Sequence, residues 1–326
     1  MTLTTLLSFA ILSRSAPTPA KAVPAPAAAS TTYALIYGVG NYPNFVNAAG
    51  ETVVNALHGP PNDTDDMRKL VTRDYGVPGS NTRLRLNSNA TADTLIADLK
   101  WVVSKVKPGD TFFFYFSGHG IQLKNAAEPD GLDEGIVLSG GRFVVDDDIR
   151  GLREAFNNAG VNVVFIFDSC FSGGLSRGPF EGFFRGQGVR FSNRLMTEKN
   201  SARRPTRRAI GGESHPKALP KQQLTANGKG YGLMLEASGE NQSSVEVEDE
   251  NGKLPARGIF TWVFAETVRQ NPSASLGAVM KAILKEFDEE GISDMQRPQY
   301  ETFNRDATGS PLRTLLKPQT TANRLQ

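Results

Sequence analysis

Short apolar runs alternate with amphipathic stretches along the chain from Thr32 onward. The apolar runs are bounded by Gly, Asn or Asp, as expected for strands that are covered on both faces. The amphipathic stretches carry apolar residues at helical spacing, with Thr, Asn or Asp near their starts. The pattern predicts strands at 33–39, 83–86, 111–116, 161–167 and 231–237, and helices at 62–75, 91–105, 146–158, 258–270 and 275–287.

This alternation predicts an α/β fold. Strands that alternate with helices form a mostly parallel sheet with helices on both faces, and we expect six strands. In such sheets the reactive loops lie beyond the carboxyl ends of the strands. Candidate chemistry is therefore sought at the points where the apolar runs end.

Two chemically reactive residues lie at such points. The run that ends at Phe116 leads into His119, one of three histidines, and the run that ends at Phe167 leads into Cys170, the single cysteine. Taken alone, a cysteine is commonly an inert core residue, and a histidine is commonly structural. Together, beyond two parallel strands, they favour nucleophilic catalysis.

A thiol and an imidazole in contact can perform acyl transfer. A thiol with its ordinary pKa of about 8.5 is mostly protonated at neutral pH. The imidazole of His119 would accept the proton of Cys170 and later donate a proton to the leaving amine. Gly118 and Gly120 leave room for a substrate chain. We expect the amide groups of Gly120 and Cys170 to form an oxyanion hole, with a contribution of about 3 kcal/mol for each donor.

The segments Ser117-Gly-His-Gly120 and Asp168-Ser-Cys170-x-Ser-Gly173 resemble the histidine and cysteine motifs of the metacaspases, within the caspase-like peptidases. The segment 33–42, the pair Asn62-Asp63 and the segment 258–261 also resemble that family. The resemblance covers residues 32–302, with a poor match in the middle. It implies a caspase-like fold and peptide-bond hydrolysis through a thioester intermediate.

The resemblance also implies an acidic S1 pocket, and hence protein or peptide substrates that are cut after Arg or Lys. The matching positions are Asp63, Ser117 and Asp168. Two carboxylates that face a guanidinium form charge-assisted hydrogen bonds. Asp63 has an alternative role as a helix cap. Asp168 follows six apolar or neutral strand residues, where a charged group needs a partner.

The sequence departs from the family pattern at several positions. Pro60 and Phe171 stand where many metacaspases have Cys and His. Many members also bind calcium, which here would involve Glu134, Asp146, Asp147 and Asp148. Arg177 stands where the family has a further Asp ligand, and a cation there weakens a calcium site. The three consecutive acids also suit the N-terminus of a helix, so calcium dependence stays open, and the chemistry itself needs no cofactor.

The middle of the chain is strongly basic. Residues 171–230 carry eight Arg and four Lys against three Glu and no Asp. A solvated linker is one interpretation, and a nucleic-acid contact, which the charge alone would permit, is disfavoured because no platform of interleaved aromatic and basic residues accompanies the charges. A peptidase specific for Arg or Lys would find its own substrate in this segment, so we predict autoprocessing. The candidate cleavage sites are Arg194, Arg203, Arg204, Arg207 and Arg208.

The N-terminal region has an apolar run at 6–12 followed by an Ala- and Pro-rich stretch. This pattern is typical of a secretory signal peptide, which predicts export. A disordered leader on a cytoplasmic protein is the alternative. No run of about 18 apolar residues is present, so we expect no membrane span, and we expect a monomer. The predicted divisions are a leader (1–31), a large-subunit-like part (32–175), the basic segment (176–228), a small-subunit-like part (229–312) and an unstructured tail (313–326).

Two other functions are compatible with parts of this pattern. A caspase-like scaffold without activity would share the fold, although such proteins often lose the Cys-His pair. A nucleotide-binding domain would share the parallel sheet. After the first strand, however, Pro43 interrupts the Gly-rich spacing that phosphate binding needs. The leading hypothesis is therefore a cysteine endopeptidase.

Overall fold

The structure is a computed structural model of the chain. It describes residues 30–42, 56–124, 132–169, 230–239, 242, 244–247, 255–304, 306 and 308–316. Cys170, Arg177 and the five candidate cleavage sites lie outside the described residues, as do nearly all of the predicted leader and the predicted basic segment.

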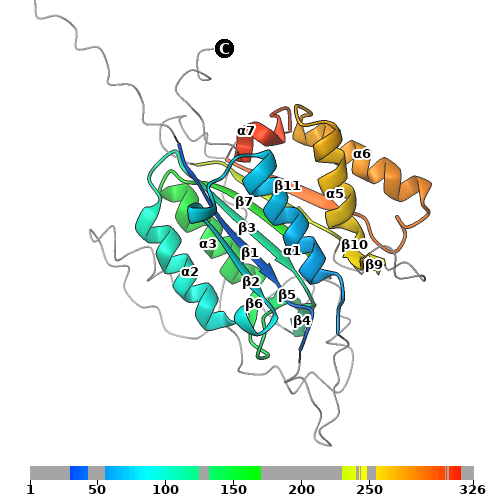
Figure 1. Cartoon of the computed structure of the whole chain (residues 1–326), viewed down its shortest axis with the longest axis horizontal. Helices are drawn as coiled ribbons and strands as arrows, with labels where there is room; N and C mark the ends of the chain where they lie inside the picture. The colour runs from blue at the N-terminus through cyan, green and yellow to red at the C-terminus, as the bar shows by residue number, and fades with distance from the viewer. Residues whose placement is uncertain are drawn as a thin grey trace, which may run out of the picture.

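A six-stranded sheet forms the centre of the molecule (Figure 1). Its strands lie in the order β11–β8–β7–β3–β1–β2, and the five other than β11 are parallel to one another, whereas β11 runs antiparallel to β8. The α/β class and the mostly parallel sheet are thus confirmed. The strands are β1 (Thr32–Gly38), β2 (Thr82–Leu86), β3 (Thr111–Ser117), β7 (Asn162–Asp168), β8 (Gly232–Glu236) and β11 (Gln299–Phe303).

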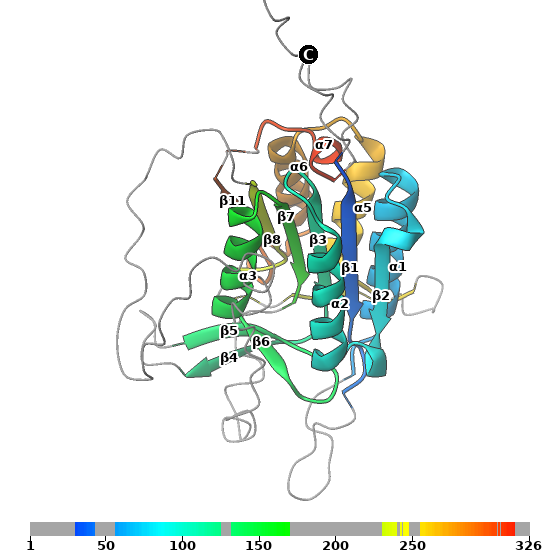
Figure 2. The same ribbon diagram turned by 90° about the vertical axis from the view of Figure 1, so that its left-hand side faces the viewer.

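Helices cover both faces of this sheet (Figure 2). One face carries α2 (Ala92–Lys105) and α3 (Asp146–Asn158). The opposite face carries α1 (Pro60–Lys69), which continues as a π-helical turn to Asp74, together with α5 (Ile259–Gln270), α6 (Leu276–Glu289) and α7 (Leu312–Leu316). Two short 3-10 turns at 79–81 and 87–89 flank β2.

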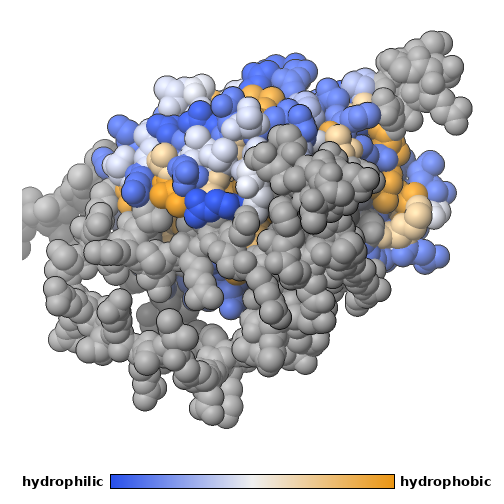
Figure 3. Space-filling view, turned by 90° about the horizontal axis from the view of Figure 1, so that it is seen from below, coloured by the Kyte–Doolittle hydropathy of each residue, from blue (hydrophilic) through white to orange (hydrophobic). Residues whose placement is uncertain are grey.

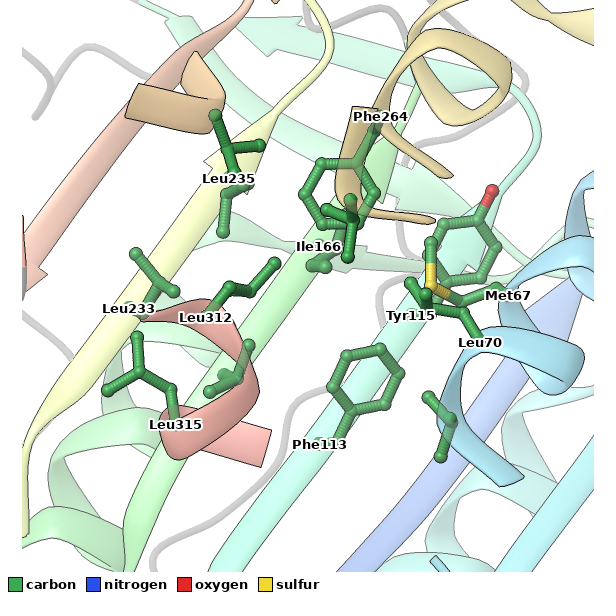
Figure 4. Close-up of a cluster of buried hydrophobic side chains, with 14 of the residues drawn as sticks. Met67, Leu70, Phe113, Tyr115, Ile166, Leu233, Leu235, Phe264, Leu312 and Leu315 are labelled. Carbon is green, nitrogen blue, oxygen red and sulfur yellow. The ribbon is translucent and has the colours of Figure 1, made fainter. Parts of the chain in front are cut away.

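Strand β3 shows why the core has two halves. All of its residues are buried, and alternate side chains point to opposite faces. Phe112, Phe114 and Phe116 pack toward α2 and α3. Phe113 and Tyr115 pack toward α1 and α5, where Figure 4 shows them beside Met67, Leu70 and Phe264. Every odd-numbered position of β3 from 113 therefore faces the α1 side of the sheet.

Two smaller sheets that the sequence pattern did not predict complete the described fold. Strands β4 (Gly120–Lys124), β5 (Leu132–Val137) and β6 (Phe143–Val145) form an antiparallel sheet directly after β3 (Figure 2). Strands β9 (Glu246–Val247) and β10 (Arg257–Gly258) form a two-residue antiparallel ladder. Both extend the molecule beyond the carboxyl ends of the central strands.

Two boundaries differ from the prediction. The first helix begins at Pro60 rather than Asn62, because Pro fits the first turn of a helix, where no backbone N–H is required. The tail predicted from residue 313 begins too early, because α7 continues to Leu316 and buries Leu312 and Leu315 in the core. Among the described residues, no helix combines the length and apolarity needed to cross a bilayer.

Candidate active site

The register of the central sheet brings the ends of β3 and β7 together. The two strands pair in parallel over seven residues, and the last pair is Ser117 with Asp168. The amide of Gly118 donates to the carbonyl oxygen of Asp168 at 3.2 Å, which joins the two strand ends. His119 lies two residues beyond Ser117, as Cys170 lies two residues beyond Asp168. The prediction that these two loops start side by side is confirmed.

Asp63 reaches this edge from the first turn of α1. Its side chain is 1% exposed. Its Oδ2 accepts a hydrogen bond from Ser117 Oγ at 2.8 Å, and its Oδ1 accepts one from the amide of Gly258 at 2.9 Å. No side chain caps α1, whose N-cap is Gly59. The alternative role of Asp63 as a helix cap is therefore wrong, and its carboxylate is instead held beside the end of β3.

The carboxylate of Asp168 accepts three hydrogen bonds, which come from Ser244 and Thr261. Its Oδ1 accepts from Ser244 Oγ at 2.5 Å. Its Oδ2 accepts from the amide of Thr261 at 3.0 Å and from Thr261 Oγ1 at 2.6 Å. Gln296, which is fully buried, donates from Nε2 to Ser244 Oγ at 3.3 Å and accepts from the amide of Val245 at 2.8 Å. The carboxylate of Asp168 thus sits in a rigid set of donors.

Glu246 brings a third carboxylate to the same place. Its two oxygens accept the backbone amides of His58 and Gly59 at 3.0 and 2.8 Å, just before α1. Its strand β9 pairs with β10 so that Glu246 lies opposite Gly258, whose amide holds Asp63. Glu246 therefore fixes the start of α1 against the segment that follows β8.

A small cavity of about 110 Å³ opens among these groups. Figure 3 views this end of the molecule from below, where hydrophilic side chains surround scattered hydrophobic patches. Among the described residues the lining of the cavity contains three carboxylates and no Lys or Arg. The lining residues are Leu57, Pro60, Asp63, Ser117, Gly118, His119, Asp168, Ser244, Val245, Glu246 and Gly258.

The electrostatics of the cavity follow from this composition. Burial, together with the charge of Asp168, raises the pKa of Asp63 well above its ordinary value. Burial also raises the pKa of Asp168, against the lowering effect of its hydrogen bonds from Ser244 and Thr261, and the charge of Glu246 adds to the increase. Carboxylates that are buried near one another resist ionisation together. The cavity is therefore a site in which a cation would be stabilised.

His119 lines the cavity, and its backbone and ring contact Tyr42. Its backbone amide donates to the hydroxyl of Tyr42 at 2.8 Å, and the two rings lie 4.9 Å apart. Gly118 before it has no space for a side chain, because a Cβ would lie 2.7 Å from Tyr42 Oη and 2.8 Å from Phe116 Cζ. Close packing thus requires glycine at this position, and the imidazole is presented at the rim.

The amide of Gly120 is placed beside His119 in β4. The amide of Val137 donates to the carbonyl oxygen of His119 at 2.9 Å, so Gly120 and Ile136 form a non-hydrogen-bonded pair of the antiparallel ladder. The ladder with β5 therefore does not engage the Gly120 amide. This placement supports its predicted role in an oxyanion hole, which stays a prediction because Cys170 lies outside the described residues.

The residues named for calcium do not form a metal site in the described part of the chain. Asp146, Asp147 and Asp148 begin α3, as predicted for acids at a helix N-terminus. Arg150 forms ion pairs with Asp146 at 3.5 Å and with Asp147 at closer range. Glu134 lies on β5. No group of three or more His, Cys, Asp or Glu side chains is gathered among the described residues for a metal, and calcium dependence stays an untested prediction.

Sequence reasoning missed four of the groups that build the site. Ser244 and Glu246 lie in a segment without periodicity, and nothing in the sequence signals their contacts with residues 76 and 187 positions away. Gly258 and Thr261 belong to a segment that was noticed only for its resemblance. The structure shows that both residues contact the buried carboxylates. Gly258 supplies an amide to Asp63, and a Cβ there would lie 2.3 Å from the Asp168 carboxylate.

The known proteins to which this chain is similar in sequence are metacaspases. A family model described as the metacaspase peptidase C14 domain matches residues 33–177. Metacaspase-1A of Aspergillus oryzae is 25% identical over 84% of this chain and 68% of its own length. Metacaspase-1 of Schizosaccharomyces pombe is 26% identical over 77% of this chain and 63% of its own length. The chain thus aligns with about two thirds of each of these relatives.

A solved structure agrees with the fold. The crystal structure of a protein from Geobacter sulfurreducens covers 86% of this chain and 97% of its own length, with a TM-score of 0.55 and 21% identity. At this identity the likeness concerns the fold alone.

Proposed function

Because the chain belongs to the metacaspase and caspase-like family of cysteine-type peptidases, which are hydrolases, we propose that it is an endopeptidase that cuts after Arg or Lys. Cys170 is the nucleophile of this proposal and His119 is its base. Protein or peptide chains with a basic residue at the cleaved bond are the substrates, and the chain acts as a monomer.

One observation carries the specificity. The carboxylates of Asp63, Asp168 and Glu246 line one small cavity at the foot of His119, and no Lys or Arg lines it among the described residues. Buried carboxylates without a cation are unfavourable, and a guanidinium or ammonium group from a substrate relieves this by charge-assisted hydrogen bonds. A basic P1 side chain that enters the cavity would leave the following peptide bond near the rim.

The chemistry proceeds by acyl transfer. The sulfur of Cys170 attacks the carbonyl carbon of the scissile bond after its proton passes to His119. The amide of Gly120 stabilises the oxyanion that forms, as does that of Cys170. The C–N bond then breaks, the amine leaves with the proton from His119, and a thioester remains. Water, deprotonated by His119, hydrolyses the thioester and restores the thiol.

We propose two roles for Glu246, one electrostatic and one structural. It adds a negative charge to the cavity and also holds the amides of His58 and Gly59. The start of α1, which carries Asp63, is therefore coupled to the segment that carries Ser244. We infer that a basic side chain in the cavity strengthens this coupling, because it shields the three carboxylates from one another.

A substrate series tests the specificity. Fluorogenic peptides that differ only at P1, with Arg, Lys, citrulline or Asp, are compared on the full chain, with calcium and with chelator. Citrulline keeps the shape of Arg and removes its charge. We expect cleavage after Arg and Lys, and at least 100-fold lower kcat/KM for citrulline and Asp. Equal rates for Arg and citrulline would refute the charge argument, and no cleavage at all would favour the inactive scaffold.

Autoprocessing is tested by comparison with an inactive variant. We propose that the basic segment is cut at one or more of Arg194, Arg203, Arg204, Arg207 and Arg208, because it presents the preferred residue close in sequence to the nucleophile. Wild type and Cys170→Ala are incubated side by side and their termini are mapped by mass spectrometry. New termini after Arg in the wild type alone support the proposal, and identical intact masses refute it.

A further inference from the structure

Strand β3 has one hydroxyl, that of Tyr115, among the aromatic residues 112–116. Its sequence from 111 is Thr-Phe-Phe-Phe-Tyr-Phe, and Tyr115 is fully buried. The ring lies in the apolar cluster shown in Figure 4. A buried hydroxyl is unfavourable by about 1–3 kcal/mol unless it is hydrogen-bonded. The position of its partner therefore shows what the hydroxyl does.

That partner belongs to the cavity. The hydroxyl of Tyr115 lies 2.6 Å from Thr261 Oγ1, and Thr261 Oγ1 lies 2.6 Å from Asp168 Oδ2. Thr261 has one hydroxyl proton, and an ionised carboxylate can only accept. The proton of Thr261 thus points to Asp168, and that of Tyr115 points to Thr261. Burial, with the charges of Asp63 and Asp168, raises the pKa of Tyr115 well above its usual value, which keeps it a donor.

This arrangement fixes the direction of the Thr261 hydroxyl that donates to Asp168. Without Tyr115, the Thr261 hydroxyl would remain free to rotate away from the carboxylate. With Tyr115 behind it, the two hydroxyls form a line of donors in which each bond polarises the next. Ser244 holds the other oxygen at 2.5 Å. The orientation of the carboxylate toward the cavity is therefore set by a residue that does not line the cavity itself.

We propose that Tyr115 is a positioning residue for recognition of the basic P1 side chain, acting on Asp168 through the hydroxyl of Thr261. This inference rests on the proposed function. It assigns to Tyr115 an effect on substrate binding rather than on the chemical step, because the line of hydroxyls ends on the carboxylate and not on His119.

The fold supplies a matched control. Tyr37 is also fully buried, lies on the neighbouring strand β1, and donates from its hydroxyl to a carboxylate, Asp98 Oδ2, at 2.7 Å. Asp98 does not line the cavity. Tyr37→Phe therefore removes a comparable buried hydrogen bond away from the site, and it measures the effect that a merely structural role would have.

The experiment uses the full chain and four variants: Tyr115→Phe, Tyr37→Phe, Thr261→Val and Thr261→Ser. For each, kcat and KM are measured with a P1-Arg peptide, and the Kd of agmatine, a small guanidinium probe, is measured by titration calorimetry. We expect Tyr115→Phe to raise KM and Kd about three- to tenfold, the effect of one buried hydrogen bond, with kcat within about twofold. Tyr37→Phe should leave all three near the wild-type values.

The Thr261 variants test the route. Thr261→Val should raise KM and Kd at least as much as Tyr115→Phe, and Thr261→Ser should retain the wild-type values. The double variant Tyr115→Phe/Thr261→Val should be no worse than Thr261→Val alone, because both changes break one line of donors. Additive effects would overturn the proposal, as would a Tyr115→Phe enzyme indistinguishable from Tyr37→Phe.

Two further outcomes are separable. If Tyr115→Phe fails to fold, the Thr261 pair decides, since equal KM values for Val and Ser would overturn the proposal. If the wild type cleaves neither Arg nor Lys peptides and does not bind agmatine, the proposed function itself fails. Cleavage by the wild type with an unaffected Tyr115→Phe variant overturns only this inference.

Discussion

Two of the buried carboxylate sites in the described part of the chain differ in how their negative charge is compensated. Asp98 on α2 is 1% exposed and receives Arg83 at 2.5 Å and Arg85 at 2.8 Å, together with the hydroxyl of Tyr37. Asp63 and Asp168 are equally hidden but receive only hydroxyl and amide donors among the described residues. One cluster is neutralised within the chain, whereas the other is not.

The consequences appear in the pKa values. Burial acts to raise the pKa of Asp98, yet its bonds from Arg85, Tyr37 and Arg83 hold it below the ordinary value. Burial and mutual repulsion leave the pKa values of Asp63 and Asp168 raised. A carboxylate with its own cation stabilises a fold, and one without a cation is available to a ligand. The difference separates a structural ion cluster from a candidate recognition site.

The largest expected effect is on specificity. Asp168→Asn removes the charge and keeps the shape, so kcat/KM for a P1-Arg peptide should fall about 100- to 1,000-fold, the range for loss of one partner from a buried charge pair. Steady-state kinetics on the full chain measures this. Asp98→Asn is the matched control, and a comparable loss there would break the distinction between the clusters.

The next largest effect is on the free energy of unfolding, where the change at Asp98 should matter more than the change at the cavity. Asp98→Asn leaves Arg83 and Arg85 without their acid and should lower the free energy of unfolding by about 2 kcal/mol at neutral pH. Asp63→Asn relieves repulsion and should leave that free energy unchanged or higher. Urea unfolding of the two variants checks the contrast, which would be lost if both destabilised the chain equally.

Glu246 should have an intermediate effect on recognition. Glu246→Gln removes a charge from the cavity and turns one side-chain amide toward a backbone N–H that needs an acceptor. We expect KM for P1-Arg peptides to rise about tenfold, as for the loss of one charge-assisted bond, with kcat nearly unchanged. Glu266→Gln on the exposed surface of α5 removes a charge away from the cavity and serves as control. A fall in kcat alone would instead place Glu246 in the chemical step.

The smallest effect is on pH dependence, where the clusters should have opposite signs. Because folding raises the pKa values of Asp63 and Asp168, their contribution to stability is present below the unfolded pKa and is lost as pH rises through the folded values. Folding lowers the pKa of Asp98, so its contribution is present at neutral pH and is lost as pH falls. Agmatine should bind more tightly as pH rises and the pair ionises. Calorimetry between pH 4 and about 8 tests this, and Asp63→Asn should flatten the profile.

Much of the fold was predictable because its core strands are unusually apolar. The run 111–116 can only be a strand that is covered on both faces, and its partners at 33–39 and 161–167 have the same character. Strand β11 was not predictable, since Gln-Tyr-Glu-Thr-Phe lies half-exposed at an edge and runs antiparallel. The sheet of β4, β5 and β6 was missed because its short strands carry Gly and charged residues.

The candidate site was predictable only in part. The strand ends identified His119 and Cys170 because parallel strands finish at one edge, whereas Asp63, Ser117 and Asp168 were predicted from the resemblance to the metacaspases. Ser244, Gly258 and Thr261 were not predictable as partners of Asp63 and Asp168, because they lie 76–195 residues away and no local pattern links them to these acids. Burial of a charge announces that a partner is required, but only the tertiary fold selects which one.

The pairing of Ser117 with Asp168 has a consequence for how this site tolerates change in length. The step from each of these residues to the proposed catalytic positions, His119 and Cys170, is two residues in both segments. A single deletion in either tip would shift one catalytic group by a residue and turn it to the opposite side of its strand, while the sheet below kept its pairing. In related chains, insertions and deletions should therefore be absent from the segments that match residues 117–120 and 168–171, and they should occur freely beyond these segments.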